Sequence, residues 1–452
     1  MSQLNIQSAS SPSPLHRAIG FWSGVGIVVG TTIGSGIFRV PADLARHVGD
    51  PRIILALWVG FGLVSLCGAL ALAELACLLP QTGGIYVYLR AAYGDAAAFV
   101  FGWLYLLVTV PSALGALAVF FGELLTQLCG FDAALAPVIA IATIVVLMAA
   151  NIRGIQQGLL IQNTFTLIKV GLLAALIVTV FAFGRGDFGH LATVAPPQPT
   201  LAGLAAAVYL VMWSNSGWQS LSMVAGEMAN PERWMTRMLV TGILTIVTLY
   251  VGANLAYFYA LPVDAIQAEP LVASRVMAMT LGQAGRKAIE IGILASVFGA
   301  LNGVMLARSR VAYALACDGL SFAVLARCHP RWATPYVAIA VQGTVAIVLV
   351  LWLREFKALT RYFAAVEYLA LAFAVAAVFI LRHTMPAAPR PYRTFGYPWV
   401  PLFFVAAAST GVVAIVVSGV NEGVFAPLIG LGITALGFPI YYLWRRGQKP
   451  SR

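Results

Sequence analysis

Apolar runs of bilayer-spanning length follow one another along almost the whole chain. A helix needs roughly twenty apolar residues to cross the hydrocarbon core, and about twelve such segments lie between charged residues or proline and glycine. Only 10% of the residues are charged, against about 25% in soluble domains. The sequence therefore predicts an all-α polytopic membrane protein with spans near residues 20–46, 52–79, 96–127, 134–151, 159–184, 201–228, 236–261, 286–316, 335–353, 358–382, 398–420 and 424–445.

The net charge of +11 is explained by how basic residues divide between the two sides of the membrane. With both chain ends cytoplasmic, inner loops hold roughly sixteen Lys or Arg residues and outer loops about ten, as the positive-inside rule expects. A nucleic-acid partner is therefore not needed to explain the charge. We expect a protein of the inner or plasma membrane, with a disordered cytoplasmic tail over residues 1–17 and a second cytoplasmic tail over residues 446–452.

The first span is interrupted near its middle, at Gly34-Ser35-Gly36. Two residues without side chains, and a serine that competes for backbone hydrogen bonds, favour a break in the helix there. A second half-helix starting near Ser35, Gly36 and Ile37 would present unpaired N–H groups and the positive end of its dipole, which suit a carboxylate. The alternative is a continuous helix whose glycines, spaced by four residues, form a close-packing seam.

A second interruption lies in the sixth span, over residues 213–218 with the sequence WSNSGW. Four small or turn-forming residues in succession favour unwinding over a polar face packed on a neighbouring helix. The half-helix that ends near Met212 to Ser214 would leave free carbonyls, which attract a cation. Side by side, the two breaks suit a zwitterion such as a free amino acid.

The two interruptions are five spans apart, so two five-helix units would enter the membrane in opposite directions, as in many secondary transporters. We expect the first unit over residues 18–184, the second over residues 200–382 and two additional helices over residues 395–445. Paired broken helices in corresponding places indicate a binding site near the bilayer midplane.

Lys169 lies about ten residues into the fifth span, too deep for its ammonium to reach the headgroups easily. A charge at that depth needs a partner or a functional cavity. We expect the ammonium to hydrogen-bond carbonyls freed by the first break, where it could also release and rebind a proton. The alternative is a lysine that snorkels along its own helix to the inner headgroups.

Three further residues are candidates for coupling or gating. Glu123 and Glu367 are predicted near the outer ends of spans three and ten, facing an outer vestibule, as proton or selectivity residues. Trp213 is either a packed aromatic or a lid on the outer side of the substrate. Arg39 is expected to pair with an outer acidic residue.

Seven sequence pieces in a fixed order carry a resemblance to a known family: VVGTTIGSGIF, AELA, PQTGGIYVYL, NIRG, WSNSGWQS, GEMANPER and GALNGVMLARSRVAYALACDG. Together they resemble the amino acid, polyamine and organocation (APC) transporter superfamily, most of all its L-type amino acid transporter branch. The resemblance implies a LeuT-type fold, with two inverted five-helix repeats, two further helices and helices 1 and 6 unwound. It also implies alternating access to a central amino acid site.

The resemblance assigns roles to individual residues. Lys169 matches the fifth-span lysine of sodium-independent members, and Trp213 matches the outer aromatic gate. The substrate-binding positions fall on Ile33, Gly34, Ser35, Gly36, Ile37, Met212, Trp213, Asn215 and Asn302.

The five cysteines show no metal-ligand spacing with the histidines, so we expect neither a metal site nor a cofactor. Animal L-type members join a glycoprotein subunit through a cysteine in the outer loop after the third span. Cys129 lies near that place, but the loop is very short. We therefore expect the chain to work without an obligatory protein subunit.

The predicted function is sodium-independent secondary transport of L-amino acids, as an exchanger of neutral amino acids. Without substrate, Lys169 and the two helix ends would be poorly compensated, so the empty carrier would reorient slowly. The alternatives are a proton-coupled symporter, which would use Lys169, Glu123 or Glu367, and a receptor that binds an amino acid without moving it. An enzyme is not expected, because no nucleophile, base and orienting group occur at a recognisable spacing.

Overall fold

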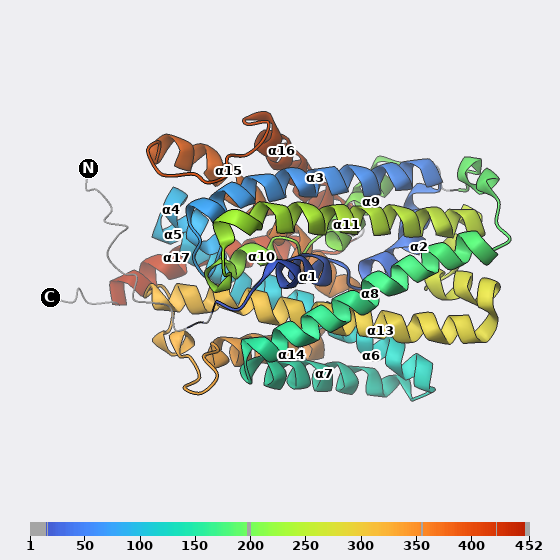
Figure 1. The fold of residues 1–452 in the computed structure, drawn as a ribbon, viewed down its shortest axis with the longest axis horizontal. Coiled ribbons are helices and arrows are strands. Elements are labelled where there is room, and N and C mark those ends of the chain that lie inside the picture. The colour runs from blue at the N-terminus through green and yellow to red at the C-terminus, as the bar shows by residue number, and fades with distance from the viewer. Residues whose placement is uncertain (1–14, 16, 197–199, 354–355, 422, 448–452) are drawn as a thin grey trace.

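The computed structural model describes residues 15, 17–196, 200–353, 356–421 and 423–447, which fold into a bundle of long helices (Figure 1). Residues 1–14 and 448–452, most of the two predicted tails, lie outside the described residues. Within the described part, 11 helical stretches are long and apolar enough to cross a membrane. The sixth predicted span is divided into shorter pieces, of which the apolar helix Leu201–Ser214 is too short to be counted with them. The predicted all-α class is confirmed.

The helix bounds agree with the predicted spans to within a few residues, except that the eighth span starts earlier and is kinked at Gly282 (φ 67°). A π-helical turn, Tyr105–Thr109, joins α5 to α6, and a 3-10 turn, Ala225–Glu227, follows α10. The α-helices are α1 Phe21–Thr32, α2 Gly36–Val48, α3 Pro51–Leu78, α4 Ile85–Tyr93, α5 Asp95–Leu104, α6 Val110–Cys129, α7 Ala136–Ile152, α8 Ile155–Phe183, α9 Leu201–Ser214, α10 Ser220–Met223, α11 Pro231–Ala260, α12 Val263–Ala268, α13 Val272–Cys317, α14 Tyr336–Leu353, α15 Phe356–Thr384, α16 Trp399–Asn421 and α17 Ala426–Gly447.

The first span breaks where the glycines predict. Helix α1 ends at Thr32, and Ile33 has an extended backbone with φ −76° and ψ 94°. Helix α2 begins at Gly36 with Ser35 as its N-cap residue. The span is therefore two half-helices, and the alternative of one continuous helix is wrong.

The sixth span also unwinds as predicted. Helix α9 ends at Ser214, and Gly217 has φ +138°, a conformation that residues with a side chain rarely adopt. Between Gly217 and the start of α11, the chain forms only the short helix α10 and the 3-10 turn Ala225–Glu227. The polar residues between the two tryptophans thus form a connecting segment inside the bundle.

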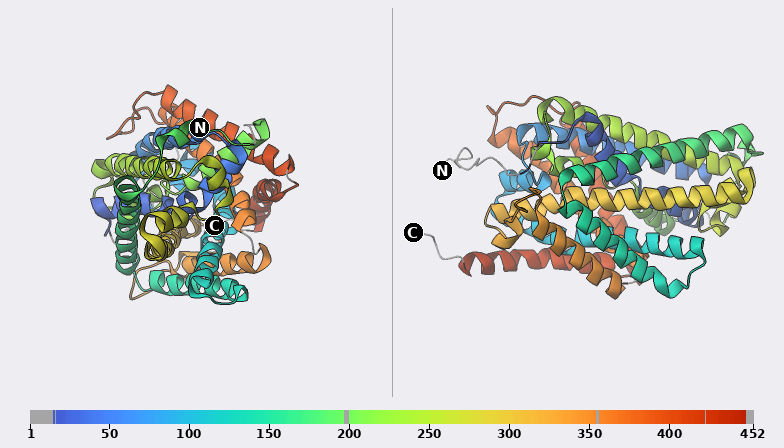
Figure 2. Two further views of the ribbon diagram at one scale, coloured as in Figure 1. Left: turned by 90° about the vertical axis from the view of Figure 1, so that its right-hand side faces the viewer. Right: turned by 60° about the horizontal axis from the view of Figure 1, so that its bottom comes forward.

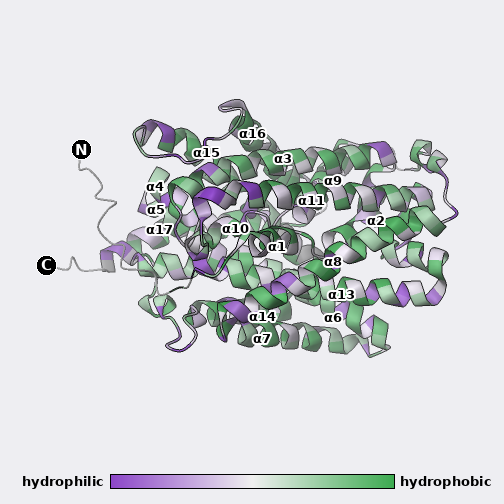
Figure 3. Cartoon of the chain, viewed as in Figure 1, coloured by the Kyte–Doolittle hydropathy of each residue, from purple (hydrophilic) through white to green (hydrophobic). Residues whose placement is uncertain are grey.

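Corresponding spans of the two predicted five-helix units contact each other. Helix α3 contacts α11, α6 contacts α13, and α7 contacts α14, which pairs spans two, three and four with spans seven, eight and nine. Figure 1 shows α3 beside α11, and Figure 2 shows the bundle end on. Hydrophilic residues gather towards the helix ends and loops, as a membrane protein requires (Figure 3). The boundaries of the two units stay a prediction.

Candidate functional site

The two broken spans contact each other at their breaks. The hydroxyl of Thr31, at the end of α1, donates to the Gly217 carbonyl over 2.9 Å. A side chain at Gly36 would come within 2.9 Å of the Ser214 Cα, and one at Gly217 within 2.6 Å of the Thr31 carbonyl carbon. Glycine is required at both positions because backbone lies against backbone there.

Tyr250 of α11 holds the two breaks together. Its hydroxyl lies 3.1 Å from the Thr32 carbonyl and 3.0 Å from the Ser214 carbonyl, one from each broken span. The side chain is almost fully buried. A single phenol proton therefore serves the last turns of α1 and α9 at once.

The start of α2 offers unused hydrogen-bond donors. The amide N–H groups of Ser35, Gly36 and Ile37 have no acceptor among the described residues. The Ser35 hydroxyl likewise has no partner among the described residues, and because Ser35 is only 1% exposed, bulk water does not supply one. Buried polar groups are normally paired, so this cluster of donors at a helix N-terminus is suited to an anion such as a carboxylate.

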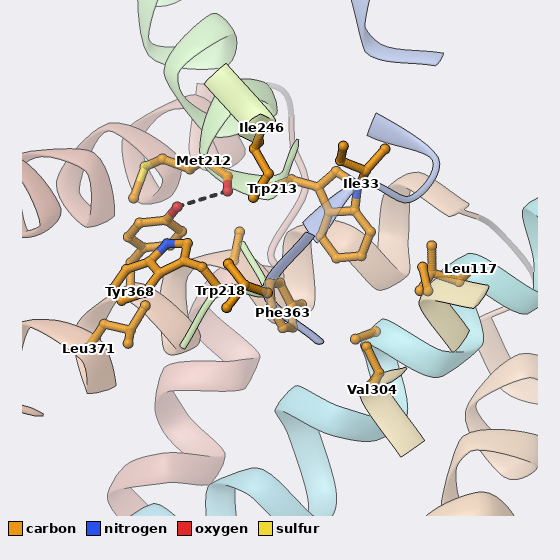
Figure 4. Close-up of a cluster of buried hydrophobic side chains, with 14 of the residues drawn as sticks. Ile33, Leu117, Met212, Trp213, Trp218, Ile246, Val304, Phe363, Tyr368 and Leu371 are labelled. Atoms are coloured by element: carbon orange, nitrogen blue, oxygen red, sulfur yellow. Dashed lines mark hydrogen bonds between the residues drawn. The ribbon is translucent and has the colours of Figure 1, made fainter. Parts of the chain in front are cut away.

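The carbonyl end of α9 is arranged differently from the prediction. Tyr368 of α15 donates to the Met212 carbonyl over 2.9 Å, as Figure 4 shows. The side-chain and backbone amides of Asn215 both donate to the Val211 carbonyl, at 3.0 and 2.9 Å. Met212 and Asn215 are therefore engaged with protein groups in this conformation, and neither lines the cavity between the two breaks. Of the three residues predicted on this span, only Trp213 does.

This cavity is small, with a volume of about 30 Å³. That volume holds one or two waters and is too small for an amino acid, so the site is closed in this conformation. Ile33 and Ile37 are fully buried beside the cavity without lining it. The residues that line it are Thr31, Thr32, Gly34, Ser35, Gly36, Ala113, Leu117, Trp213, Ser214, Ser216, Val304, Arg308 and Phe363.

Trp213 lines one side of this cavity together with Phe363 and also packs against Phe356. Its ring meets Phe356 and Phe363 edge to face, with centroids 5.9 and 5.1 Å apart. Figure 4 shows Trp213, Phe363, Leu117 and Val304 around the same space. The tryptophan is thus a packed aromatic, one of the two predicted alternatives, and it also forms part of the cavity wall. Its role as a gate stays a prediction.

Lys169 bonds the first break as predicted. Its ammonium donates to the Gly30 carbonyl over 2.8 Å and to the Ile33 carbonyl over 2.5 Å. The Ser296 hydroxyl of α13 lies 3.4 Å from the same Ile33 carbonyl. Lys169 is fully buried midway along α8, so the alternative of a snorkelling lysine is wrong.

Glu123 lies near the C-terminal end of α6, the end that the predicted topology places on the outer side. Its carboxylate pairs with Arg39 over 2.7 Å, and the Glu123 side chain is 43% exposed. It lines a separate cavity of about 410 Å³ between α6, α7 and α14. The expected pairing of Arg39 with an acidic residue is confirmed, while the outer position of that residue stays a prediction.

Glu367 is predicted to face an outer vestibule, and that placement is wrong. The carboxylate is fully buried, accepts a 2.9 Å hydrogen bond from Tyr105 and another from the Gln219 amide, and lies 3.3 Å from Arg308. Helix α15 turns this residue into the bundle beside the second break. Arg308, which lines the cavity, is not among the predicted site residues.

Asn302 does not line the cavity in this conformation, and its contact with substrate stays a prediction. Its side chain bonds the Asn151 amide at 2.9 Å, the Gly158 carbonyl at 2.9 Å and the Gln162 side chain at 3.2 Å. These contacts place it between α7, α8 and α13, away from the cavity, which Val304 and Arg308 of the same helix line. Asn302 thus packs helices together in this conformation.

On the C-terminal side of the second break, a buried ion pair links the connecting segment to α13. Glu227 accepts hydrogen bonds from Arg310 at 2.8 and 3.0 Å, with both side chains at most 2% exposed. Ile19 pairs with the same segment, because its N–H donates to the Glu227 carbonyl over 3.0 Å. The N-terminal segment before α1 is therefore held against the segment that follows the second break.

The family model and the similar proteins all indicate the same family. Residues 19–438 match the family model described as amino acid permease. The serine/threonine exchanger SteT of Bacillus subtilis is 32% identical over 431 residues, which cover 95% of this chain and 97% of that protein. The cystine/glutamate transporter of Homo sapiens is 29% identical, covering 97% and 87%. The human large neutral amino acids transporter small subunit 2 is 29% identical, covering 96% and 82%.

Among solved structures, MhsT in complex with L-phenylalanine superposes with a TM-score of 0.64, covering 90% of this chain and 99% of that chain. The sequence identity is 14%, so this likeness concerns the fold alone. It confirms the predicted LeuT-type arrangement of helices.

Proposed function

The chain belongs to the amino acid permease family, and from this premise we propose that it exchanges neutral L-amino acids across the membrane by alternating access, without sodium. Amino acid transport is the activity that the names of its relatives share. The geometry supports a zwitterionic substrate, since unpaired N–H groups at Ser35 and Gly36 lie beside the end of α9. We also propose that both chain ends are cytoplasmic.

The position of the Lys169 ammonium carries the proposal of sodium independence. The Gly30 and Ile33 carbonyls, with the Ser296 hydroxyl nearby, form an oxygen cluster of the kind that binds a small cation. The ammonium already occupies it, so the protein supplies its own positive charge. A sodium ion would have to displace a buried, doubly bonded lysine.

Exchange, rather than free movement of the empty carrier, follows from the unpaired donors of the first break. The Ser35 hydroxyl and the first N–H groups of α2 have no acceptor within the described ranges of the chain. Each such group costs about 1–3 kcal/mol, and a bound carboxylate would remove that cost. The substrate-loaded carrier is therefore expected to change conformation faster than the empty one.

Counterflow in proteoliposomes tests this function. We expect labelled L-serine, L-alanine or L-leucine to enter vesicles that contain unlabelled amino acid and to be excluded from empty vesicles. Replacing sodium by choline should leave the rate unchanged. Sodium-dependent uptake would contradict the proposal, and uptake limited to the amount of protein present would favour a receptor.

A proton-coupled symporter is the second candidate, because Glu367 is a buried carboxylate whose Oε2 has no hydrogen-bond partner among the described residues. Such a group beside the cavity could hold a proton during transport. Accumulation of amino acid in empty vesicles on an imposed pH gradient would favour this mechanism over exchange.

Replacing Trp213 by alanine is expected to leave amino acid binding detectable while lowering the exchange rate about tenfold or more. The indole supplies one wall of the cavity and two ring contacts, so its removal opens the closed state to water. Binding measured by thermal shift and exchange measured by counterflow separate the two effects. Equal losses in both would instead indicate a purely structural role.

We further propose that the chain functions without an obligatory second subunit. The name of the human relative, small subunit 2, denotes an assembly for that protein. In this chain only residues 130–135 lie between Cys129 at the end of α6 and the start of α7, which makes the connecting loop short. Counterflow with the purified chain alone tests the proposal, because a required partner would be absent.

A further inference from the structure

We propose that Arg308, backed by Glu367, forms a side-chain subsite for a short substrate side chain that ends in a hydroxyl or a carboxamide. This inference rests on the proposed function and deepens it. Of the described residues that line the cavity, Arg308 is the only charged one. It lies on α13 and lines the same cavity as Ser35 and Gly36 of the first break and Ser214 and Ser216 of the second.

The guanidinium is held in a fixed position. Its Nε donates to the Ser220 hydroxyl over 3.3 Å, and its Nη1 lies 3.3 Å from the Glu367 carboxylate. The rings of Phe363 and Tyr105 lie 5.5 and 5.9 Å from its central carbon. The side chain is 2% exposed, so it is a rigid group of the kind that selects among ligands.

The hydrogen bonds of this ion pair are incomplete. Arg308 Nη1 and Glu367 Oε2 are both buried without a hydrogen-bond partner in the described part of the chain. Buried charges are normally completed by further hydrogen bonds, because desolvation is otherwise uncompensated. A neutral polar group in the adjacent cavity could accept from the guanidinium.

Charge and size narrow the class of side chain. Glu367 already balances the guanidinium, so an acidic side chain would compete with that carboxylate and a basic one would face Arg308 directly. The remaining wall, from Ala113, Leu117 and Val304, is apolar and close. A short neutral side chain with a polar end fits these surroundings. A wholly apolar side chain would leave the guanidinium without a further hydrogen-bond acceptor.

Near-isosteric substrate pairs test the subsite in the wild-type protein. Threonine differs from valine, and asparagine from leucine, mainly by the polar group. In counterflow we expect threonine and asparagine to compete at concentrations at least about tenfold lower than valine and leucine, with aspartate weak. Equal competition within both pairs would overturn the subsite, even where exchange itself is robust.

Neutralising both partners tests the residues. The double variant Arg308→Met/Glu367→Gln avoids an unpaired buried charge and should bring the threonine-to-valine ratio close to one while valine still competes. The matched control, Arg286→Met/Glu290→Gln, removes a pair on the same helix whose arginine is 44% exposed, and should keep the wild-type ratio. A preference that survives in the Arg308 double variant would overturn the assignment. If that variant does not fold, the wild-type ratios decide.

Absence of counterflow with every amino acid in the wild type would contradict the proposed function itself, and the subsite with it. Exchange that lacks the polar preference contradicts the subsite alone. The two failures are therefore distinguishable in one set of vesicles.

Discussion

Replacing Lys169 by alanine is expected to lower amino acid exchange by at least about a hundredfold while the protein still inserts in the membrane. The variant loses two hydrogen bonds from a charged donor, to the Gly30 and Ile33 carbonyls. Such bonds contribute roughly 1.5–3 kcal/mol each, and 1.36 kcal/mol corresponds to about tenfold in rate. Because these carbonyls flank the break, their release also disturbs the end of α1 and the donors of α2.

The matched control is Lys287→Ala, since that lysine is exposed near the outer end of the span that contains α13. Exchange rates from counterflow should be normalised to the amount of monodisperse protein in the vesicles. The control should exchange at the wild-type rate. Normal exchange in the Lys169 variant would remove the role assigned to this residue and, with it, the argument for sodium independence.

The breaks in spans one and six are predictable from the sequence because their cause is local. Glycine and serine at positions 34–36, and the polar run at 213–218, disfavour a continuous helix whatever surrounds them. The partner of Lys169 is predictable as well. A lysine at that depth needs acceptors, and in a membrane the break is the obvious source of free carbonyls.

The side-chain placements that the sequence does not give depend on rotation about helix axes, which hydropathy does not specify. Asn302 and Arg308 lie on the same helix, yet only Arg308 reaches the cavity. The sequence predicts Glu367 near the outer end of its span, facing a vestibule. In the structure its side chain instead points into the bundle, where it accepts a hydrogen bond from Gln219. The Met212 carbonyl is taken by Tyr368, a partner far away in the chain.

Arg308 carries a signal in the sequence that the prediction did not use. An arginine deep inside an apolar span is a functional candidate by default. It stands in a family motif together with Arg310, which forms a structural pair with Glu227, so the motif alone does not separate the two arginines. A resemblance gives the fold well, but the charge of each intramembrane residue still has to be explained by itself.

Replacing Gly36 by valine is expected to abolish amino acid binding, with at least about a hundredfold loss of affinity. Even a Cβ at this position would lie 2.7 Å from the Ser214 Cβ and 2.9 Å from its Cα, so α2 would have to move away from α9. Overpacking of this kind costs about 1–3 kcal/mol, and two branched methyl groups would cover the N–H donors of Ser35 and Gly36. The carboxylate would lose its partners at the same time as the two breaks separate.

Gly60→Val is the matched control, because Gly60 lies in helix α3 and no atom comes within 4 Å of the position that its Cβ would take. Both substitutions introduce the same β-branched residue into a membrane helix, so they share any general effect of valine on helix stability. Thermal shift with and without amino acid, and counterflow, should show wild-type behaviour for Gly60→Val and no ligand response for Gly36→Val. Wild-type affinity in the Gly36 variant would mean that the carboxylate is held elsewhere, since no backbone approach at this break would then be needed.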